Sequence, residues 1–384
     1  MPETVVLLNP RDLVIDAARR LGLSMVVVPA PDGPDPGDVP GLVFRSPWTT
    51  DPGALVTRLR ELDLPGPVAC FGFGELGCSA AAVVNERLGW PGTRPGALET
   101  FRDKAKLRAA VGDLAGVPVA HAVCDTLAEL GRAIARIGYP CIVKPVDGTG
   151  SAGVTRLDGP ADAEALTELD RPHLVEEFLH GSEYSVEAMS SPRGHRILAI
   201  TEKATTGAPH FVETGHTLPV DPGQATAIAD LVAATLDAAG YHYGVSHTEV
   251  MLTTDGPRLI ESHGRPGGDR ISDMLGLALG EDVFEQSMAV VFGRPTPAGP
   301  ARRRVAGIRY VTFPPGTPVP AVDLTAVSAL PGVVEAHLSA VPGDRPPVVR
   351  QSRDRHGFVV AVGDTREELE THLARAVTAF TRGS

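Results

Sequence analysis

Short apolar runs alternate with amphipathic segments along the N-terminal part of the chain. The apolar runs predict strands at 4–8, 24–29, 41–44 and 68–71. The segments that follow them predict helices at 11–22, at 52–62 and from the glycines near 72 to about 88. Strands that alternate with helices in this way indicate a parallel, doubly wound sheet. The proline- and glycine-rich run 90–96 then predicts a domain boundary.

The rest of the chain mixes helices and strands less regularly. The pattern predicts a helix over 98–115, a strand over 117–123, a helix over 126–137, a helix over 160–168 and a strand over 173–178. The segment 301–384 predicts strands at 305–312 and 357–362 and a final helix from 365, where residues 365–368 have the form of a capping box. This last segment carries no obvious chemistry, and we expect it to complete the central domain and to be available for contacts in a homodimer.

A glycine-rich hairpin is predicted near the middle of the chain. An apolar strand candidate ends at Lys144, and the loop after it holds Gly148, Gly150 and Gly153 before a second extended run, 154–157. Glycines let backbone N–H groups approach a ligand closely, and such groups beside a lysine suit phosphate oxygens. A Walker loop would place its lysine after the loop, at the start of a helix, so we expect a flap over a nucleotide. The alternative is an ordinary glycine-rich turn.

Two acidic strands form the strongest constellation. Residues 247–252 and 258–263 alternate with a period of two, and a turn at 253–257 joins them. A hairpin closed at the centre of this turn would pair Glu249 with Glu261, His247 with His263, and Met251 with Leu259. Paired Cβ atoms lie ~5 Å apart, where like charges repel, and a bound divalent cation would remove the conflict. The alternatives are a shifted register or an exposed pair that is tolerated.

Polar residues on either side of this hairpin are candidates for ligand binding. Arg265 lies in a glycine-rich turn before a predicted helix, where its guanidinium and free N–H groups can bind an anion. The run 174–187 is either a plain surface strand or a connection between lobes that offers backbone groups to an adenine and Glu183 to ribose hydroxyls. His210, Glu213 and His216 match no standard zinc spacing. They indicate a substrate-contacting loop or an ordinary polar loop.

The run 72–77 fits the pattern GxGxxG, which can mark dinucleotide binding. That fingerprint belongs to the first strand of such a fold, whereas this run follows a late strand. We expect instead a tight turn that places Glu75 at the edge of the sheet where ligands bind, although Glu75 could also be an acid that only stabilises a helix N-terminus.

Composition narrows the class of protein. A formal net charge of −12 argues against a nucleic-acid binder and against a protein that binds anionic membranes, since both need a basic face. The four cysteines form no metal-ligand spacing and are expected to be buried free thiols. No stretch has the pattern of a signal peptide or a membrane span, so a cytoplasmic location is expected.

Taken in order, these motifs resemble the ATP-grasp superfamily, and most closely its carboxylate–amine ligase branch, which includes bacterial L-amino-acid (dipeptide) ligases. The resemblance extends from about residue 100 to 295 and rests on Asp103-Lys104, the Lys144 hairpin, the run from Glu176 to Glu183, and Glu249 and Glu261 followed by Arg-Pro-Gly-Gly. It implies a multidomain α/β and α+β protein with the ATP-grasp fold. The expected parts are an N-terminal α/β domain (1–96), an ATP-grasp domain (97–300) with a lid subdomain at about 117–178, and a C-terminal lobe (301–384).

The resemblance also implies roles for individual residues. ATP would be bound by Lys104, Lys144, the flap residues Gly148, Thr149, Gly150, Ser151 and Gly153, the adenine-side residues Glu176, Glu177 and Leu179, and Glu183. Mg²⁺, or Mn²⁺, would be bound by Glu249, Glu261 and His263, although many relatives have asparagine at the last position, which leaves the number and preference of metal ions open. Catalytic and substrate roles would fall to Arg265, Gly268 and His247, and to Glu75, His210, Glu213, His216, Gly267 and Asp269.

These roles imply an ADP-forming ligase. A small substrate carboxylate would attack the γ-phosphate of ATP, and an amine would then attack the acyl phosphate to give an amide or a dipeptide. His247 and Glu213 are the candidates for the general base. Alternatives are transfer to a carrier-protein thiol, a carboxylase-type reaction with bicarbonate or phosphate, a non-catalytic nucleotide-binding module, and a dehydrogenase built on the run 72–77.

Overall fold

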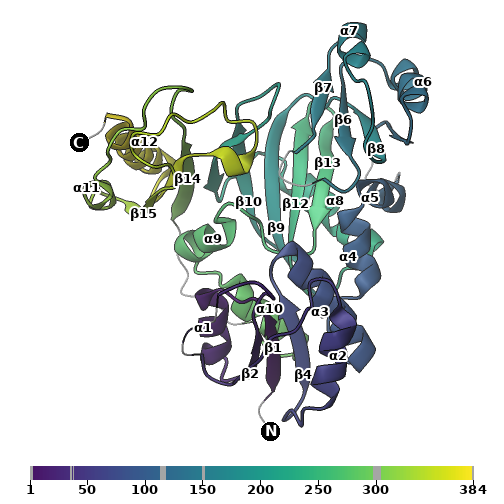
Figure 1. The fold of residues 1–384 in the computed structure, drawn as a ribbon, viewed down its shortest axis with the longest axis vertical. Coiled ribbons are helices and arrows are strands. Elements are labelled where there is room, and N and C mark those ends of the chain that lie inside the picture. Colours follow the sequence, from purple (N-terminus) through teal and green to yellow (C-terminus); the bar gives the residue numbers. More distant parts are fainter. Residues whose placement is uncertain are drawn as a thin grey trace.

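Three β-sheets organise the chain, and the computed structural model describes residues 3–34, 37, 39–112, 118–148, 152–296 and 304–382. Figure 1 shows the N-terminal sheet at the bottom, a long central sheet above it and a second small sheet at the upper right. The C-terminal helix lies at the upper left, on the other side of the central sheet from the second small sheet (Figure 1). This arrangement brings segments far apart in sequence around the central sheet.

The N-terminal sheet is parallel, with the strand order β3-β2-β1-β4. It contains β1 (Thr4–Leu8), β2 (Ser24–Val28), β3 (Leu42–Val43) and β4 (Val68–Gly72), and its helices are α1 (Asp12–Arg20), α2 (Pro52–Arg60) and α3 (Glu75–Leu88). Val5 and Leu7 pack in one core with residues of α1, whereas Val6 and Leu8 pack in another with residues of α2 and α3. Helices therefore cover both faces, which confirms the predicted doubly wound sheet.

The predicted helix over 98–115 is wrong, because two helices occupy this region. They are α4 (Pro95–Arg102) and α5 (Lys104–Val111), and they are separated by Asp103 in an extended conformation. The Asp103 carboxylate accepts hydrogen bonds from the N–H groups of Ala105 and Lys106 at 2.9 and 3.0 Å. Asp103 is thus an N-cap that starts a new helix, and the bend gives Lys104, the first residue of α5, a buried position.

The second small sheet is antiparallel, with the order β5-β8-β6-β7. Its strands are β5 (His121–Cys124), β6 (Cys141–Pro145), β7 (Thr155–Leu157) and β8 (His173–Glu177), and its helices are α6 (Leu127–Ile137) and α7 (Pro160–Glu164). Strands β6 and β7 form the predicted hairpin around the glycine-rich loop. Of that loop, Thr149, Gly150 and Ser151 lie outside the described residues.

The central sheet has the order β13-β12-β9-β10-β11-β14-β16-β15 and is antiparallel throughout. Its strands are β9 (Ser182–Ser191), β10 (Gly194–Thr205), β11 (Glu213–Leu218), β12 (Gly244–Thr253), β13 (Gly256–His263), β14 (Val305–Val311), β15 (Val333–Leu338) and β16 (Gly357–Gly363). Associated helices are α8 (Ala225–Ala239), α9 (Ile271–Leu279), α10 (Val283–Val291), α11 (Leu324–Ser328) and α12 (Arg366–Arg382), with a short 3₁₀ turn at Ser352–Asp354.

The C-terminal segment extends this central sheet. Strand β14 pairs with β11, and β16 and β15 follow it outward. The sequence pattern predicted β14, β16 and α12 but missed β15 and α11, which are short. The segment therefore shares one sheet with Glu183, predicted to bind ATP, and with Glu249 and Glu261, predicted to bind a metal ion.

Two global expectations can be compared with the fold. Within the described ranges, no helix is long and apolar enough to cross a membrane. The four cysteines are free, and Cys70, Cys124 and Cys141 are buried, which agrees with the expectation of buried thiols.

Candidate functional site

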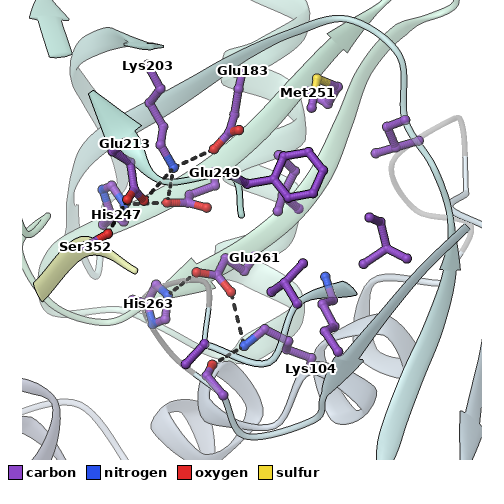
Figure 2. A pocket seen from close by; sticks show the side chains of 18 of the residues that line it. Lys104, Glu183, Lys203, Glu213, His247, Glu249, Met251, Glu261, His263 and Ser352 are labelled. Carbon is purple, nitrogen blue, oxygen red and sulfur yellow. Dashed lines mark hydrogen bonds and ion pairs between the residues drawn. The ribbon is translucent and has the colours of Figure 1, made fainter. Parts of the chain in front are cut away.

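A cavity of about 290 Å³ lies between the second small sheet and the β9–β13 half of the central sheet. Figure 2 shows the polar side chains that converge on it from β9, β10, β11, β12, β13 and the start of α5. The structure brings together in its lining most of the residues that sequence reasoning selected: Lys104, Lys144, Gly148, Glu176, Glu177, Leu179, Glu183, Glu213, His216, His247, Glu249, Glu261, His263, Arg265, Gly268 and Asp269.

The β12–β13 hairpin has the predicted register where it matters for the acids. Glu249 pairs with Glu261, and His247 pairs with His263. The predicted pairing of Met251 with Leu259 is wrong, because Met251 lies opposite Arg258. A bulge leaves Ile260 as the extra residue of β13, which shifts the remaining pairs by one.

Glu261 lies among cationic groups. Its carboxylate is 3.1 Å from the Lys104 ammonium and 3.0 Å from Nε2 of His263 (Figure 2). Burial alone would raise the pKa of Glu261, but Lys104 and His263 hold it well below its usual range. The Lys104 ammonium also donates to the carbonyl of Gly148 at 2.5 Å, which ties α5 to the glycine-rich loop.

Lys203 is a central cation that sequence reasoning did not select. Its buried ammonium lies 2.5 Å from the carboxylates of Glu183 and Glu249 and 3.9 Å from that of Glu213 (Figure 2). Burial lowers the pKa of Lys203, but the surrounding carboxylates raise it well above its ordinary value. The period-two alternation of β10 gives Lys203 the same face as the buried Thr201, and this was the signal available in the sequence.

A second buried cluster joins Lys144 to Glu176. The Lys144 ammonium is 2.6 Å from one Glu176 oxygen, and Nε of Arg108 donates to the other at 2.5 Å. Burial raises the pKa of Glu176, but Lys144 and Arg108 lower it to about 2. Both oxygens of Glu176 therefore have cationic partners. Arg108, in the middle of α5, had no signal in the sequence.

His247 is held between two carboxylates. Its Nδ1–H donates to Glu187 at 2.5 Å, and Nε2 lies 3.4 Å from Glu249. Burial would lower the pKa of His247, but Glu187 and Glu249 raise it to about 9. His247 is thus protonated near neutral pH, which argues against its predicted role as the general base. Glu187 was not selected from the sequence.

Glu187 also fixes the glycine turn after β13. The N–H of Gly267 donates to Glu187 at 3.2 Å, and a Cβ on Gly267 would come within 2.8 Å of the His247 ring and 2.9 Å of Glu187. The Gly267 amide is therefore already bonded and does not face the cavity as predicted. Gly268 has open space where a Cβ would be and lines the cavity, so its amide is the better candidate for binding an anion.

Arg265 pairs with Glu75 across the boundary with the N-terminal sheet. Nε of Arg265 donates to Glu75 at 2.6 Å, and Nδ1 of His263 is 3.6 Å from the same oxygen. Burial raises the pKa of Glu75, but His263 and Arg265 lower it to about 2. The tight turn of the run 72–77 is also present, since a Cβ on Gly72 would come within 2.2 Å of the Gly77 backbone.

The C-terminal segment contributes to the cavity beside Glu213 of β11, so the expectation that it carries no obvious chemistry is wrong. Ser352 lines the cavity and its hydroxyl donates to the Glu213 carboxylate (Figure 2). Arg355 binds Asp269 with two hydrogen bonds, at 2.8 and 2.7 Å. Asp269 also accepts a hydrogen bond from Nε2 of His216 at 3.0 Å.

Some selected residues lie elsewhere. His210, Gly153, Gly267 and Glu75 do not line the cavity, although Glu75 reaches it through Arg265.

Across the described part of the chain, no group of three or more histidine, cysteine, aspartate or glutamate side chains is arranged to hold a metal ion. Nε2 of His263 lies 3.0 Å from the Glu261 carboxylate, and Glu261 and Glu75 raise the pKa of His263 against the effect of burial.

Comparison with known proteins identifies the class to which this fold and cavity belong. The ATP-grasp domain family matches residues 137–273, and the expected ATP-grasp fold is confirmed: the chain contains an ATP-grasp domain, and that domain implies use of ATP. Residues 309–381 match the family described as L-amino acid ligase C-terminal domain 2. The chain thus combines an ATP-grasp domain with an L-amino acid ligase C-terminal domain.

Individual relatives agree with this combination. The chain is 30% identical over 309 residues to the uncharacterized protein y4rH of Sinorhizobium fredii, covering 76% of this chain and 63% of that protein. It is 29% identical to carnosine synthase 1 of Mus musculus (66% of this chain, 34% of that protein) and 28% identical to alanine–anticapsin ligase of Bacillus subtilis (57% and 53%). The chain therefore spans less than two thirds of the length of these curated relatives.

A solved structure extends the comparison to the whole fold. The crystal structure of the L-amino acid ligase from Bacillus licheniformis has a TM-score of 0.80 over 98% of this chain and 97% of that one, at 22% identity. At this identity the likeness shows the fold alone. It includes the C-terminal segment that carries Ser352 and Arg355.

Proposed function

We propose that the chain is an ATP-dependent, ADP-forming ligase that joins the carboxylate of a small amino acid to an amine through an acyl phosphate. The observation that carries the proposal is that three lysines, two paired acids and an arginine line one cavity. We assign Lys104, Lys144 and Lys203, with Glu249 and Glu261, to a nucleotide end, and Arg265, Gly268, Glu213, His216 and Ser352 to a substrate end; the two meet where the Glu213 carboxylate lies 3.9 Å from the Lys203 ammonium. Residues 309–381 match a family described as L-amino acid ligase C-terminal domain 2, and one relative is named alanine–anticapsin ligase.

The first end suits a nucleotide. Three lysine ammonium groups can neutralise phosphate oxygens, and apolar side chains offer a slot for a planar base. These apolar residues come from β6, β12 and β13 and from the loops after β6 and β8: Ile142, Val154, Phe178, Leu179, Met251 and Ile260. We propose that adenine lies against these side chains and the backbone from Glu176 to Leu179, with Glu183 towards the ribose.

Magnesium fits the same end. Glu249 and Glu261 face each other across the hairpin as hard oxygen donors, and each already has a cationic partner that offsets its charge. Mg²⁺ commonly uses one or two carboxylates together with substrate phosphates, so two acids are sufficient. When bound there, the ion would neutralise the phosphates; Mn²⁺ has the same ligand preference.

The second end suits the reacting carboxylate and the amine. Arg265 is held in place by Glu75 and offers a fixed positive charge, and Gly268 offers a backbone N–H beside it. Such preorganised donors stabilise the negative charge that develops on a tetrahedral intermediate. With His247 protonated, Glu213 is the remaining candidate among the two proposed bases for the amine proton.

The test is to incubate the protein with ATP, Mg²⁺ and pairs of amino acids and to measure ADP, AMP, phosphate and pyrophosphate. ADP release that needs both amino acids, and that Glu261→Ala and Arg265→Ala abolish, would support the proposal. Glu61→Ala and Arg304→Ala, which change exposed ion pairs elsewhere on the chain, serve as matched controls. AMP with pyrophosphate would contradict the acyl-phosphate route, whereas ADP release that needs bicarbonate or a carrier-protein thiol would reassign the acceptor.

A further inference from the structure

We propose that Arg355 is a positioning residue for ligation, through which the C-terminal domain holds the substrate end of the cavity in its working geometry. The inference rests on the proposed function. Arg355 itself does not line the cavity. It acts through Asp269, which follows Gly268 directly, and through the two separate segments that carry Glu213 and Ser352.

Arg355 holds a turn with an uncommon backbone conformation. Asp269 and Arg270 both have left-handed backbone angles, with φ of 51° and 65°. Two such residues in succession, neither of them glycine, persist only when surrounding contacts fix them. Arg355 supplies those contacts to Asp269, with hydrogen bonds at 2.8 and 2.7 Å to its two carboxylate oxygens. The direction of the Gly268 amide therefore depends on this pair.

The Arg355 guanidinium joins three segments of the chain. Nη1 of Arg355 also donates to the carbonyl of Glu213 at 3.3 Å, and Nε donates to the carbonyl of Ser352 at 2.6 Å. The same group stacks at 3.4 Å on the ring of Tyr310 in β14. A planar fork with five N–H donors is needed for this set of contacts, and a lysine ammonium cannot reproduce it.

Arg355 also stabilises the buried charge of the Asp269 carboxylate. The Asp269 oxygen that accepts from Arg355 Nη1 also accepts from Nε2–H of His216, so the carboxylate sets the orientation of that imidazole. Burial works against ionisation of Asp269, but Arg355 and His216 together keep its pKa well below the usual range. Without Arg355, a largely buried carboxylate would keep only His216 and the Tyr310 hydroxyl as partners. The turn, His216 and the segment that carries Glu213 would then all be free to shift.

The experiment compares Arg355→Ala and Arg355→Lys with Arg353→Ala, an exposed arginine of the same 3₁₀ turn. A displacement of ~1 Å in a catalytic site can cost ~100-fold in rate, so we expect Arg355→Ala to lower kcat/KM for the amino acids by about that factor. Arg355→Lys should lose most of the same activity, because it keeps the charge but not the fork. The Kd for ADP, measured by calorimetry, should stay within about twofold, since Arg355 makes no contact with the nucleotide end.

Rescue of kcat/KM by guanidinium ion at millimolar concentration distinguishes a positioning role from a merely structural one. We expect it to restore part of kcat/KM in Arg355→Ala and to leave Arg353→Ala unchanged. If Arg355→Ala and Arg355→Lys kept the kcat/KM of wild type, this inference would be overturned while the proposed function would stand. The same holds if ADP affinity and activity fell equally and guanidinium gave no rescue. A wild-type protein that releases ADP with no amino-acid pair would instead overturn the proposed function, and this inference with it.

Discussion

Replacing Glu176 by glutamine removes the anion that two buried cations share. Glu176, Lys144 and Arg108 are each less than a tenth exposed, and their contacts tie β8 to β6 and α5 at 2.6 and 2.5 Å. Arg108 also donates to the carbonyl of Ile260 in β13 at 3.2 Å. The cluster thus fastens the second small sheet to the central sheet beside the nucleotide end of the cavity.

The size of the effect follows from the pKa of Glu176. Its lowering from 4.5 to about 2 is a difference of about 2.5, and at about 1.4 kcal/mol per pKa unit this gives roughly 3 kcal/mol of stability. A depressed pKa in the folded state means that this contribution is complete above pH 4.5 and is lost as the pH falls towards 2. Breaking a buried ion pair commonly costs about 3–5 kcal/mol, which agrees in magnitude.

The assay is urea unfolding of wild type, Glu176→Gln and Glu177→Gln at pH 7 and at several pH values below 4.5. Glu177 is the matched control, since it is the next acid on β8 but its side chain is 35% exposed; we expect it to lose less than about 1 kcal/mol. Glu176→Gln should lose about 3 kcal/mol at pH 7, and the difference from wild type should shrink below pH 4.5. Equal losses in the two variants, or a difference that is independent of pH, would refute the reasoning.

Three further outcomes are expected. Lys203→Met should raise the KM for ATP and lower kcat at least 100-fold, because it removes a cation that faces the phosphate end; steady-state kinetics would show this, and unchanged values would contradict it. Wild type should lose unfolding free energy between pH 6.5 and 9 in EDTA, because the raised pKa of His247 stabilises the folded state below that window; Glu187→Gln should reduce this loss, with Glu249 keeping part of it. Asp103→Ala should cost about 1 kcal/mol in urea unfolding through loss of the helix cap; no loss would exclude capping as its main role.

The sequence was sufficient where the chemistry is local. The pairing of Glu249 with Glu261 follows from period-two alternation around a short turn, and both signals lie within fifteen residues. The pairing of Met251 was wrong because one extra residue, Ile260, forms a bulge that no alternation pattern reveals. The helix break at Asp103 was predictable, since aspartate is a preferred N-cap.

The sequence was insufficient where a residue gains its role from a distant partner. Lys203 and Glu249 are 46 residues apart, Glu187 and His247 are 60 apart, and Asp269 and Arg355 are 86 apart. In each pair one residue, Lys203, Glu187 or Arg355, was not selected from the sequence, and only the fold brings it to its partner. The same reason explains why the C-terminal segment had no recognisable chemistry of its own.

The lysine–carboxylate pairs of the cavity have a consequence for how a nucleotide enters it. Lys104, Lys144 and Lys203 all have carboxylate partners before any phosphate arrives. Nucleotide binding is then an exchange of ions, in which phosphates take ammonium groups away from carboxylates, and not the filling of a bare positive field. Because these ammonium groups are already paired, the long-range attraction of the cavity for the nucleotide is small, and association should depend only weakly on ionic strength.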